Sequence, residues 1–100
     1  MDHAALPELE PQPLPDLLLY ARSGCGLCDE TRSVLDTLLA ARAAAGLATP
    51  RLVERDISTN PVWERAFFTA IPVVELAGRR LSLATSQTKL ERLLAEVLDR

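Results

Sequence analysis

The sequence predicts an α/β domain in which three helices flank a central four-stranded mixed β-sheet. Three observations predict this fold class. Apolar runs of strand length alternate with longer segments whose apolar residues recur at helical spacing. The first two runs enclose a helix-length segment, which is the order of a parallel βαβ unit with a right-handed crossover. The last two runs are separated by a short turn at Ala77-Gly78-Arg79, which predicts a C-terminal hairpin.

The first half of the domain is a predicted strand followed by a long helix. Residues 17–20 form a continuous apolar run, which is typical of a central strand covered on both faces. The helix is expected from residue 27 to about residue 45, with Gly46 as its stop. Its recurring apolar residues are Leu27, Val34, Leu35, Leu38 and Leu39. Its charged residues, expected to form a solvated face, are Arg32, Asp36 and Arg42.

Residues 51–57 are expected to form a second strand, nearer an edge of the sheet because the segment is rich in charge. Asn60 and Pro61 then fit the cap and first residue of a helix with an apolar stripe. That stripe consists of Trp63, Ala66 and Phe67, and we expect Trp63 to pack rather than to touch a substrate.

Residues 73–76 and 80–83 are the predicted strands of the hairpin. Thr85 or Ser86 is expected to cap the last helix. One apolar stripe on that helix should cover the sheet, and it consists of Leu90, Leu93, Leu94, Val97 and Leu98. The residues expected to face water are Glu91, Arg92, Glu96, Asp99 and Arg100.

Length and charge restrict the class of protein. The chain has 100 residues, enough for one domain with a modest core, and 48% of them are apolar. A net charge of −3 gives no basic footprint for nucleic acid. No apolar run approaches the ~18 residues of a membrane span. Because no lysine or arginine precedes Arg22 and no long apolar run begins the chain, we expect no secretory signal and a cytoplasmic protein.

Residues 1–16 differ in composition from the rest of the chain. They hold four prolines, at positions 7, 11, 13 and 15, which favour an extended and solvated segment. We therefore predict a flexible leader at 1–16, ahead of a single domain at 17–100. A docking peptide for a partner protein is the alternative interpretation of the leader.

Cys25 and Cys28 are the only cysteines, and they lie on the turn between the first strand and the first helix. A Cys-x-x-Cys pair in this context is the signature of a redox site. The N-terminus of a helix beginning near Cys25 carries roughly half a positive charge. That charge favours a thiolate and should lower the Cys25 pKa below its free value of about 8.5. Cys28 lies one turn further in and should be more buried, so Cys25 is the expected attacking sulfur and Cys28 the resolving one.

Residues around the pair have opposing electrostatic effects. Gly26 would let another chain approach the sulfur closely. Arg22 is placed to add positive charge beside the thiolate, whereas Asp29 and Glu30 would raise the thiol pKa.

Two other interpretations of the cysteine pair remain. A zinc site would need ligands from a second chain, because zinc takes about four ligands and His3, in the leader, is the only histidine. A structural disulfide would close so short a loop that it would constrain the unfolded chain little. Spacing and context favour a redox pair, which in the cytoplasm is kept mostly reduced and used catalytically.

Ile71-Pro72, just before the predicted strand at 73–76, is the second stretch that carries chemistry. A proline there fits a bend entering a strand, and cis geometry is open to it. The backbone of Ile71 would then be able to pair with an extended substrate chain beside Cys25. An ordinary turn proline is the alternative, and the upstream cysteine pair favours the first interpretation.

The order of these elements resembles the thioredoxin fold, and within it the glutaredoxin-like proteins. The resemblance covers about residues 17–98. Three segments look like those of a small bacterial glutaredoxin-like family: residues 19–30 around the cysteines, 54–57 in the second strand, and 70–74 around the Ile-Pro pair.

By this resemblance Cys25 is the nucleophile, Cys28 resolves, and Pro72 is cis. The residues then expected to contact a substrate are Arg22, Gly26, Leu27, Ile71 and Pro72.

The sequence departs from two branches of the superfamily. Thioredoxins have an aspartate six residues before the first cysteine and a tryptophan just before it, where this chain has Leu19 and Gly24. Glutathione-binding glutaredoxins usually carry a proline-aromatic pair between the cysteines and a Gly-Gly…Asp stretch near the last helix. This chain has Gly26-Leu27 between its cysteines and no aspartate in residues 81–86. Cations that would still meet a carboxylate are Arg22, Arg79 and Arg80.

We therefore predict a thiol–disulfide oxidoreductase that reduces protein or low-molecular-weight disulfides through Cys25 and Cys28. Neither a metal nor an organic cofactor is expected, and glutathione, another small thiol or a reductase is left open as electron donor. We expect a monomer with no nucleic-acid or membrane partner. The alternative from another class is a thioredoxin-fold binding module or redox-sensitive adaptor with little turnover.

Overall fold

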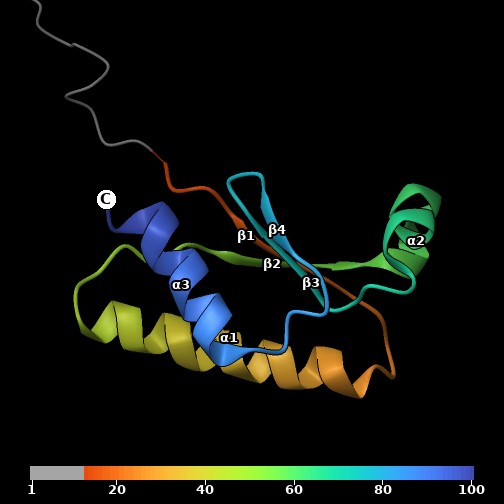
Figure 1. Cartoon of the computed structure of the whole chain (residues 1–100), viewed down its shortest axis with the longest axis horizontal. Helices are drawn as coiled ribbons and strands as arrows, with labels where there is room; N and C mark the ends of the chain where they lie inside the picture. The colour runs from red at the N-terminus through yellow and green to blue at the C-terminus, as the bar shows by residue number, and fades with distance from the viewer. Residues whose placement is uncertain (1–12) are drawn as a thin grey trace, which may run out of the picture.

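The computed structural model describes residues 13–100 (Figure 1). In chain order the elements are β1 (Leu17–Ala21), α1 (Gly26–Ala44), β2 (Leu52–Asp56), the 3₁₀ helix η2 (Ile57–Thr59), α2 (Pro61–Phe67), β3 (Val73–Leu76), β4 (Arg79–Leu81) and α3 (Gln87–Leu98). The four strands form one sheet in the order β2-β1-β3-β4. Strand β1 is parallel to β2 and antiparallel to β3, and β3 is antiparallel to β4. The predicted mixed sheet, βαβ unit and hairpin are confirmed.

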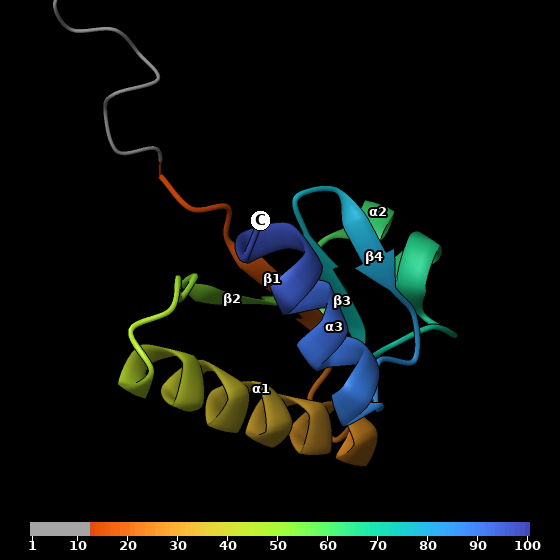
Figure 2. The same ribbon diagram turned by 60° about the vertical axis from the view of Figure 1, so that its left-hand side comes forward.

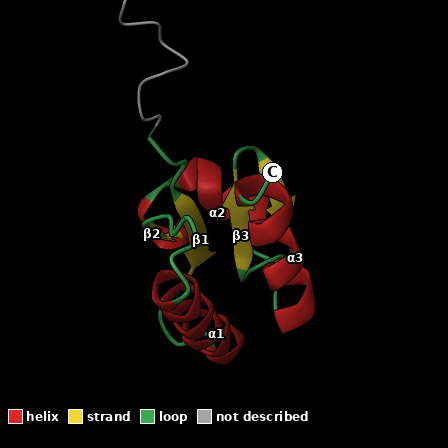
Figure 3. Cartoon of the chain, turned by 90° about the vertical axis from the view of Figure 1, so that its left-hand side faces the viewer, coloured by secondary structure: helices red, strands yellow, loops and turns green. Residues whose placement is uncertain are grey.

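Helices α1 and α3 lie together on one side of the sheet, and α2 lies apart from them (Figures 2 and 3). The alternation of side chains along β1 explains this layering. Leu17, Leu19 and Ala21 join the core beneath α1 and α3. Tyr20 instead joins a second cluster with Phe67 of α2. Two apolar faces on one central strand therefore require helices on both sides of the sheet.

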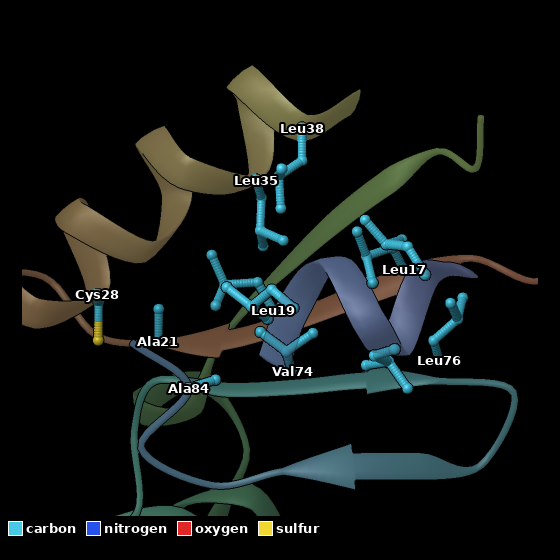
Figure 4. Close-up of a cluster of buried hydrophobic side chains, with 12 residues drawn as sticks. Leu17, Leu19, Ala21, Cys28, Leu35, Leu38, Val74, Leu76 and Ala84 are labelled. Atoms are coloured by element: carbon cyan, nitrogen blue, oxygen red, sulfur yellow. The ribbon is translucent and has the colours of Figure 1, made fainter. Parts of the chain in front are cut away.

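The larger core fills the space between α1, α3 and the sheet. Figure 4 shows Leu35 and Leu38 pointing from α1 toward Leu17 and Leu19 of β1. Three of these four side chains are fully buried, namely Leu17, Leu19 and Leu35. Burial of each such leucine contributes roughly 1.5–3 kcal/mol, so this layer holds α1 in place over β1.

The smaller cluster confirms the packing role expected for Trp63. Its ring meets Tyr20 edge-on, with the ring centroids 5.8 Å apart. The Arg55 guanidinium lies 5.2 Å from the Trp63 ring and donates a 2.8 Å hydrogen bond to the Tyr20 hydroxyl. Ala66, expected in the same stripe, is exposed, because the short helix α2 buries only Phe67.

The buried face of α1 differs from the predicted one. It runs through Cys28, Thr31, Leu35, Leu38 and Arg42. Leu27 lies off this line, and 48% of its surface is exposed. Arg42, expected in solvent, is only 9% exposed. Its guanidinium donates a 2.7 Å hydrogen bond to the Ala48 carbonyl and forms an ion pair with Asp99, and these partners make its burial tolerable.

Element ends follow local capping chemistry. Strand β2 stops at Asp56, whose carboxylate accepts a hydrogen bond from the Ser58 N–H and begins η2, so the predicted strand at 51–57 is one residue too long at each end. Asn60 and Ser86 are the N-caps of α2 and α3, as expected. Gly46, with a φ of +72°, follows the end of α1.

The hairpin is tighter and shorter than predicted. Its turn consists of Ala77 and Gly78, both with positive φ, which matches the two-residue turn preferred by twisted strands. Strand β4 ends at Leu81, so Ser82 and Leu83 leave the sheet. Most of the predicted leader lies outside the described residues. None of the helices in residues 13–100 combines the length and apolar character needed to cross a membrane.

A buried hydrogen bond joins α1 to the segment before α3. The Thr31 hydroxyl donates to the Ala84 carbonyl at 2.9 Å, and both residues are buried. The sequence pattern gave no sign of this contact. A buried carbonyl that loses such a donor destabilises the folded state by its full desolvation penalty.

We predict that Thr31→Val lowers the free energy of unfolding by about 1–3 kcal/mol, because it keeps the side-chain shape and removes the donor to Ala84. Urea unfolding followed by circular dichroism measures the change. Thr37→Val is the matched control, since Thr37 is exposed on the same helix. It should change stability by less than about 0.5 kcal/mol. Equal losses in the two variants would contradict the assigned role of the Thr31 hydroxyl.

A second prediction concerns pH. The hydrogen bond from Arg42, and then its charge, hold the pKa of Asp99 below its ordinary value. The stabilisation is therefore present above about pH 4 and is lost as the pH falls through the lower folded-state value. Asp99→Asn should lower the melting temperature at neutral pH, and the difference should begin to shrink below about pH 4 and disappear once the pH is below the depressed folded-state pKa of Asp99. Asp36→Asn, at an exposed position of α1, is the control. A difference that persists at low pH would refute the mechanism.

Candidate active site

Cys25 is the N-cap residue of α1, which places its sulfur at the start of the helix. The Cys28 backbone N–H donates to Cys25 Sγ at 3.1 Å. The two sulfurs form a disulfide, with 5.2 Å between the Cα atoms. Cys25 is partly exposed, whereas Cys28 is 0% exposed. The expected contrast in burial between the two cysteines is therefore present in the structure.

The position of Cys28 follows from the buried face of α1. Figure 4 shows its sulfur beside Ala21 of β1 and Ala84. All three residues belong to the larger core. The helix places its first turn of N–H groups around Cys25, where negative charge is favoured. The same helix places Cys28 in apolar surroundings, where a thiol is favoured over a thiolate.

Gly24 and Gly26 flank the partly exposed cysteine. Gly24 has a φ of +78°, a conformation that L side chains rarely adopt, and this turn delivers Cys25 to the helix start. Gly26 has no positive φ, and a Cβ there, as at Gly24, would meet nothing within 4 Å. Its missing side chain leaves space beside Cys25 that opens to solvent. Leu27 follows with an exposed side chain.

The Ile71–Pro72 peptide bond is cis. Pro72 is fully buried, and Ile71 packs partly buried against both apolar clusters. The segment before α3 runs alongside this pair. The Leu83 N–H donates to the Ala70 carbonyl at 2.8 Å, and the Ala84 N–H donates to the Pro72 carbonyl at 2.9 Å.

Thr31 connects this segment to the cysteine-bearing helix. Its hydroxyl binds the Ala84 carbonyl, and the Ala84 N–H binds the Pro72 carbonyl. Cys28 and Thr31 lie one helical turn apart on the buried face of α1. The helix turn that carries Cys28 is thereby tied to the cis-proline bend. A polar residue on an otherwise apolar helical stripe was the available signal for this residue.

Leu83 is another residue that the sequence analysis did not identify. Its φ of +48° is in the left-handed region, which is disfavoured for a leucine, and 57% of its surface is exposed. Two backbone hydrogen bonds hold it, one from its own N–H to Ala70 and one from the Thr85 N–H to its carbonyl. This conformation keeps a large apolar side chain in solvent next to the cis-proline segment.

The cations near the cysteine turn are compensated by carboxylates. Arg22 forms an ion pair with Glu64, which raises the Arg22 pKa first through the hydrogen bond and then through its charge. Arg32 pairs with Asp29 at 2.7 Å and with Glu54, and these contacts raise its pKa. Neither arginine is therefore an uncompensated positive charge beside the sulfur.

A polar hollow of about 270 Å³ adjoins the turn. It is lined by Ala21, Arg22, Ser23, Gly24, Asp29, Arg32, Glu54 and Asp56. The Ser58 hydroxyl and N–H lower the pKa of Asp56, so this carboxylate is charged at neutral pH. Across residues 13–100, no group of three or more His, Cys, Asp or Glu side chains is placed to hold a metal ion.

Solved structures with the same fold come from three organisms and have low sequence identity to this chain. A structural genomics target protein from X. campestris is 25% identical with a TM-score of 0.64, over 80% of this chain and 96% of that chain. Mitochondrial thioredoxin 3 from Saccharomyces cerevisiae, in its oxidised form, is 21% identical with a TM-score of 0.59, over 85% of this chain and 80% of that one. The thioredoxin Deadhead from Drosophila melanogaster is 22% identical with a TM-score of 0.61, over 87% and 84%. The two thioredoxins support the fold alone.

No curated protein matches the sequence. The Glutaredoxin-like domain (DUF836) family, in contrast, matches residues 16–98. This match includes every strand and helix described above, together with the cysteine pair and the Ile71–Pro72 bend. The sequence resemblance to glutaredoxin-like proteins is thus confirmed, and the chain belongs to the Glutaredoxin-like domain (DUF836) family.

Proposed function

We propose that this protein is a thiol–disulfide oxidoreductase that reduces disulfides of proteins or small molecules. A glutaredoxin-like fold with a Cys-x-x-Cys pair supports a redox function in general. The single observation that carries the finer proposal is the contrast within the pair. A partly exposed sulfur lies at a helix N-terminus, bonded to a fully buried one.

The reaction begins with the reduced pair. The Cys25 thiolate attacks one sulfur of a substrate disulfide, and the other substrate sulfur leaves as a thiolate that takes up a proton. Cys28 then loses its proton and attacks Cys25 Sγ. This step releases the second substrate sulfur and forms the Cys25–Cys28 bond. The substrate gains two electrons, and a reductase or a small thiol such as glutathione must return two electrons to the pair.

Residues around Cys25 have proposed roles in substrate contact. The Cys28 N–H, 3.1 Å from Cys25 Sγ in the disulfide form, is positioned to favour the thiolate in the reduced form. Gly26 leaves room for the substrate, and Leu27 offers it an apolar surface. The backbone of Ile71, ahead of Pro72, would align an extended substrate chain. Arg22 would act only together with Glu64, because the two form an ion pair.

The proposed setting is a reducing compartment such as the cytoplasm, where small thiols and reductases keep a cysteine pair reduced. We propose that the protein acts there as a monomer, without a metal or an organic cofactor. Its partners would be the disulfide substrate and the donor of electrons.

One observation favours a second candidate function, a redox-sensitive adaptor with little turnover. Cys28 belongs to the same apolar core as Leu19, Ala21 and Ala84, and Leu19 is fully buried. Among the buried residues of the described part of the chain there is no Asp or Glu, so no buried carboxylate is available to take the proton of Cys28. Slow deprotonation of Cys28 would slow release of a bound partner from Cys25. The two functions differ in the rate of this second step.

In Cys25→Ser the attacking sulfur is gone. We therefore expect the rate at which a small aromatic disulfide is reduced to fall to the rate given by the buffer thiol alone. Cys28→Ser should keep the first step and accumulate a stable mixed disulfide at Cys25, detected by intact-protein mass spectrometry. Full activity of Cys25→Ser would remove this residue as the nucleophile. Rapid first attack with very slow release in the unmodified protein would favour the adaptor.

The division between the two sulfurs has its own test. In reduced protein, the single thiol of Cys28→Ser should react with iodoacetamide much faster than the single thiol of Cys25→Ser. The reason is that Cys25 is reachable and at a helix N-terminus, whereas Cys28 is enclosed by the core. Alkylation rates at several pH values, followed by mass spectrometry, measure the ratio. Equal rates in folded protein would refute the assignment.

A further inference from the structure

A basic groove lies between the edge strand β4 and helix α3. Its volume is about 270 Å³. The residues that line it are Arg79, Arg80 and Leu81 of β4 and Lys89, Arg92, Leu93 and Glu96 of α3. It shares no lining residue with the cysteine turn or the Ile71–Pro72 bend. We propose that this basic groove binds an acidic segment of a partner protein, which adds to the sheet as an extended strand along β4.

The charge of the groove supports an acidic ligand. Among its lining residues four are cations and one, Glu96, is an anion, but the Arg80 guanidinium lies near Glu75 and the Phe67 ring, so Arg79, Lys89 and Arg92 supply the positive charge of the groove. Glu96 pairs with Arg79 at 2.7 Å. Lys89 and Arg92 are exposed, and neither has an ion-pair partner within residues 13–100. This cluster is positive although the whole chain has a net charge of −3. An acidic ligand would therefore be attracted to the groove and not to the protein surface in general.

The backbone of β4 supports a strand-shaped ligand. Strand β4 is the last in the sheet order, so its outer edge has no strand beside it in the described part of the chain. An edge strand presents unpaired N–H and C=O groups that an extended peptide is able to bind. Hydrogen bonds to the main chain then provide affinity, and pockets for alternate side chains provide specificity.

Side-chain direction along β4 determines which ligand residues enter the groove. Arg79 points toward α3, where it meets Glu96, whereas Arg80 points to the opposite face, with its guanidinium 5.0 Å from the Phe67 ring centroid. A strand added beside β4 would likewise alternate. Every second ligand side chain would face Lys89 and Arg92, and acidic residues at those positions would meet both cations. Leu93, at 3% exposure, provides an apolar floor.

The structure thus assigns two separate surfaces to one small domain. Because the groove does not include the cysteine turn, a docked partner would leave Cys25 accessible. The proposal goes beyond the redox function and needs no sulfur chemistry. A peptide without cysteine therefore tests it, and its failure is distinguishable from a failure of the proposed activity.

The probe is a fluorescein-labelled peptide of alternating glutamate and valine, and the comparison peptide alternates lysine and valine. Fluorescence anisotropy at low ionic strength measures binding to the whole chain. The groove variant combines Arg79→Gln, Lys89→Gln and Arg92→Gln. The matched control, with the same change in charge, combines Arg51→Gln, Arg65→Gln and Arg100→Gln. All six positions are exposed.

We expect the acidic peptide alone to bind, with affinity reduced about tenfold in the groove variant, because this variant removes Lys89 and Arg92, which would meet the acidic side chains, and also the nearby charge of Arg79. The control variant should lose less than about twofold. Amide NMR shifts in unmodified protein should centre on residues 79–81 and 89–96, which keeps the test independent of how the variants fold. Binding should be the same in Cys25→Ser.

Several outcomes would overturn the proposal. Equal losses in the two triple variants would mean that net charge, and not the groove, governs binding. Displacement of the peptide by millimolar inorganic phosphate, or equally tight binding of duplex DNA, would indicate a general anion site. A dimer that the groove variant disrupts, seen by analytical ultracentrifugation, would assign the edge of β4 to a second copy of this chain. Amide shifts confined to other elements would place the peptide elsewhere.

Discussion

The hydrogen bond from the Thr31 hydroxyl to the Ala84 carbonyl is the contact on which the arrangement of the site depends. It joins the first turns of α1 to the segment before α3, and Ala84 in turn binds the Pro72 carbonyl. Three pieces of chain that are far apart in sequence thereby meet behind the disulfide. Apolar packing alone would tolerate small shifts of α1 along the sheet. A buried donor and acceptor do not, because each is penalised when it loses its partner.

The same helix also separates the two cysteines. One full turn of helix converts a partly exposed cap into a core position, so Cys25 meets solvent while Cys28 is enclosed. The charged side chains near Cys25 contribute less to the stability of its thiolate than their number suggests. Arg22 is paired with Glu64, and Arg32 is paired with two carboxylates. The N–H groups at the helix start are therefore the main electrostatic support for a thiolate at Cys25.

What could be predicted from the sequence depended on the range of each interaction. The order of elements along the chain, the cap at Asn60, a cap at Thr85 or Ser86 and the hairpin follow from local patterns, and the structure has all of them, with Ser86 as the last cap. The roles of Thr31 and Arg42 depend on partners 53 and 57 residues away. Their residue types gave no sign of those partners, since a lone threonine or arginine on a helix is more often solvated. The positive φ of Leu83 could not be predicted, because backbone hydrogen bonds in the folded chain hold this residue in a conformation that leucine disfavours.

The basic groove raises the question of whether its charges only protect an edge strand. Arginines on an exposed edge discourage pairing with other chains, and Arg79 and Arg80 fit that role. Lys89 and Arg92 do not, because they belong to α3 and not to the edge. They also lie on the stripe of α3 that lines the groove, together with Leu93. Protection against neutral strands would need no such stripe, whereas selection of an acidic strand would. Cations on both walls repel a basic partner and attract an acidic one.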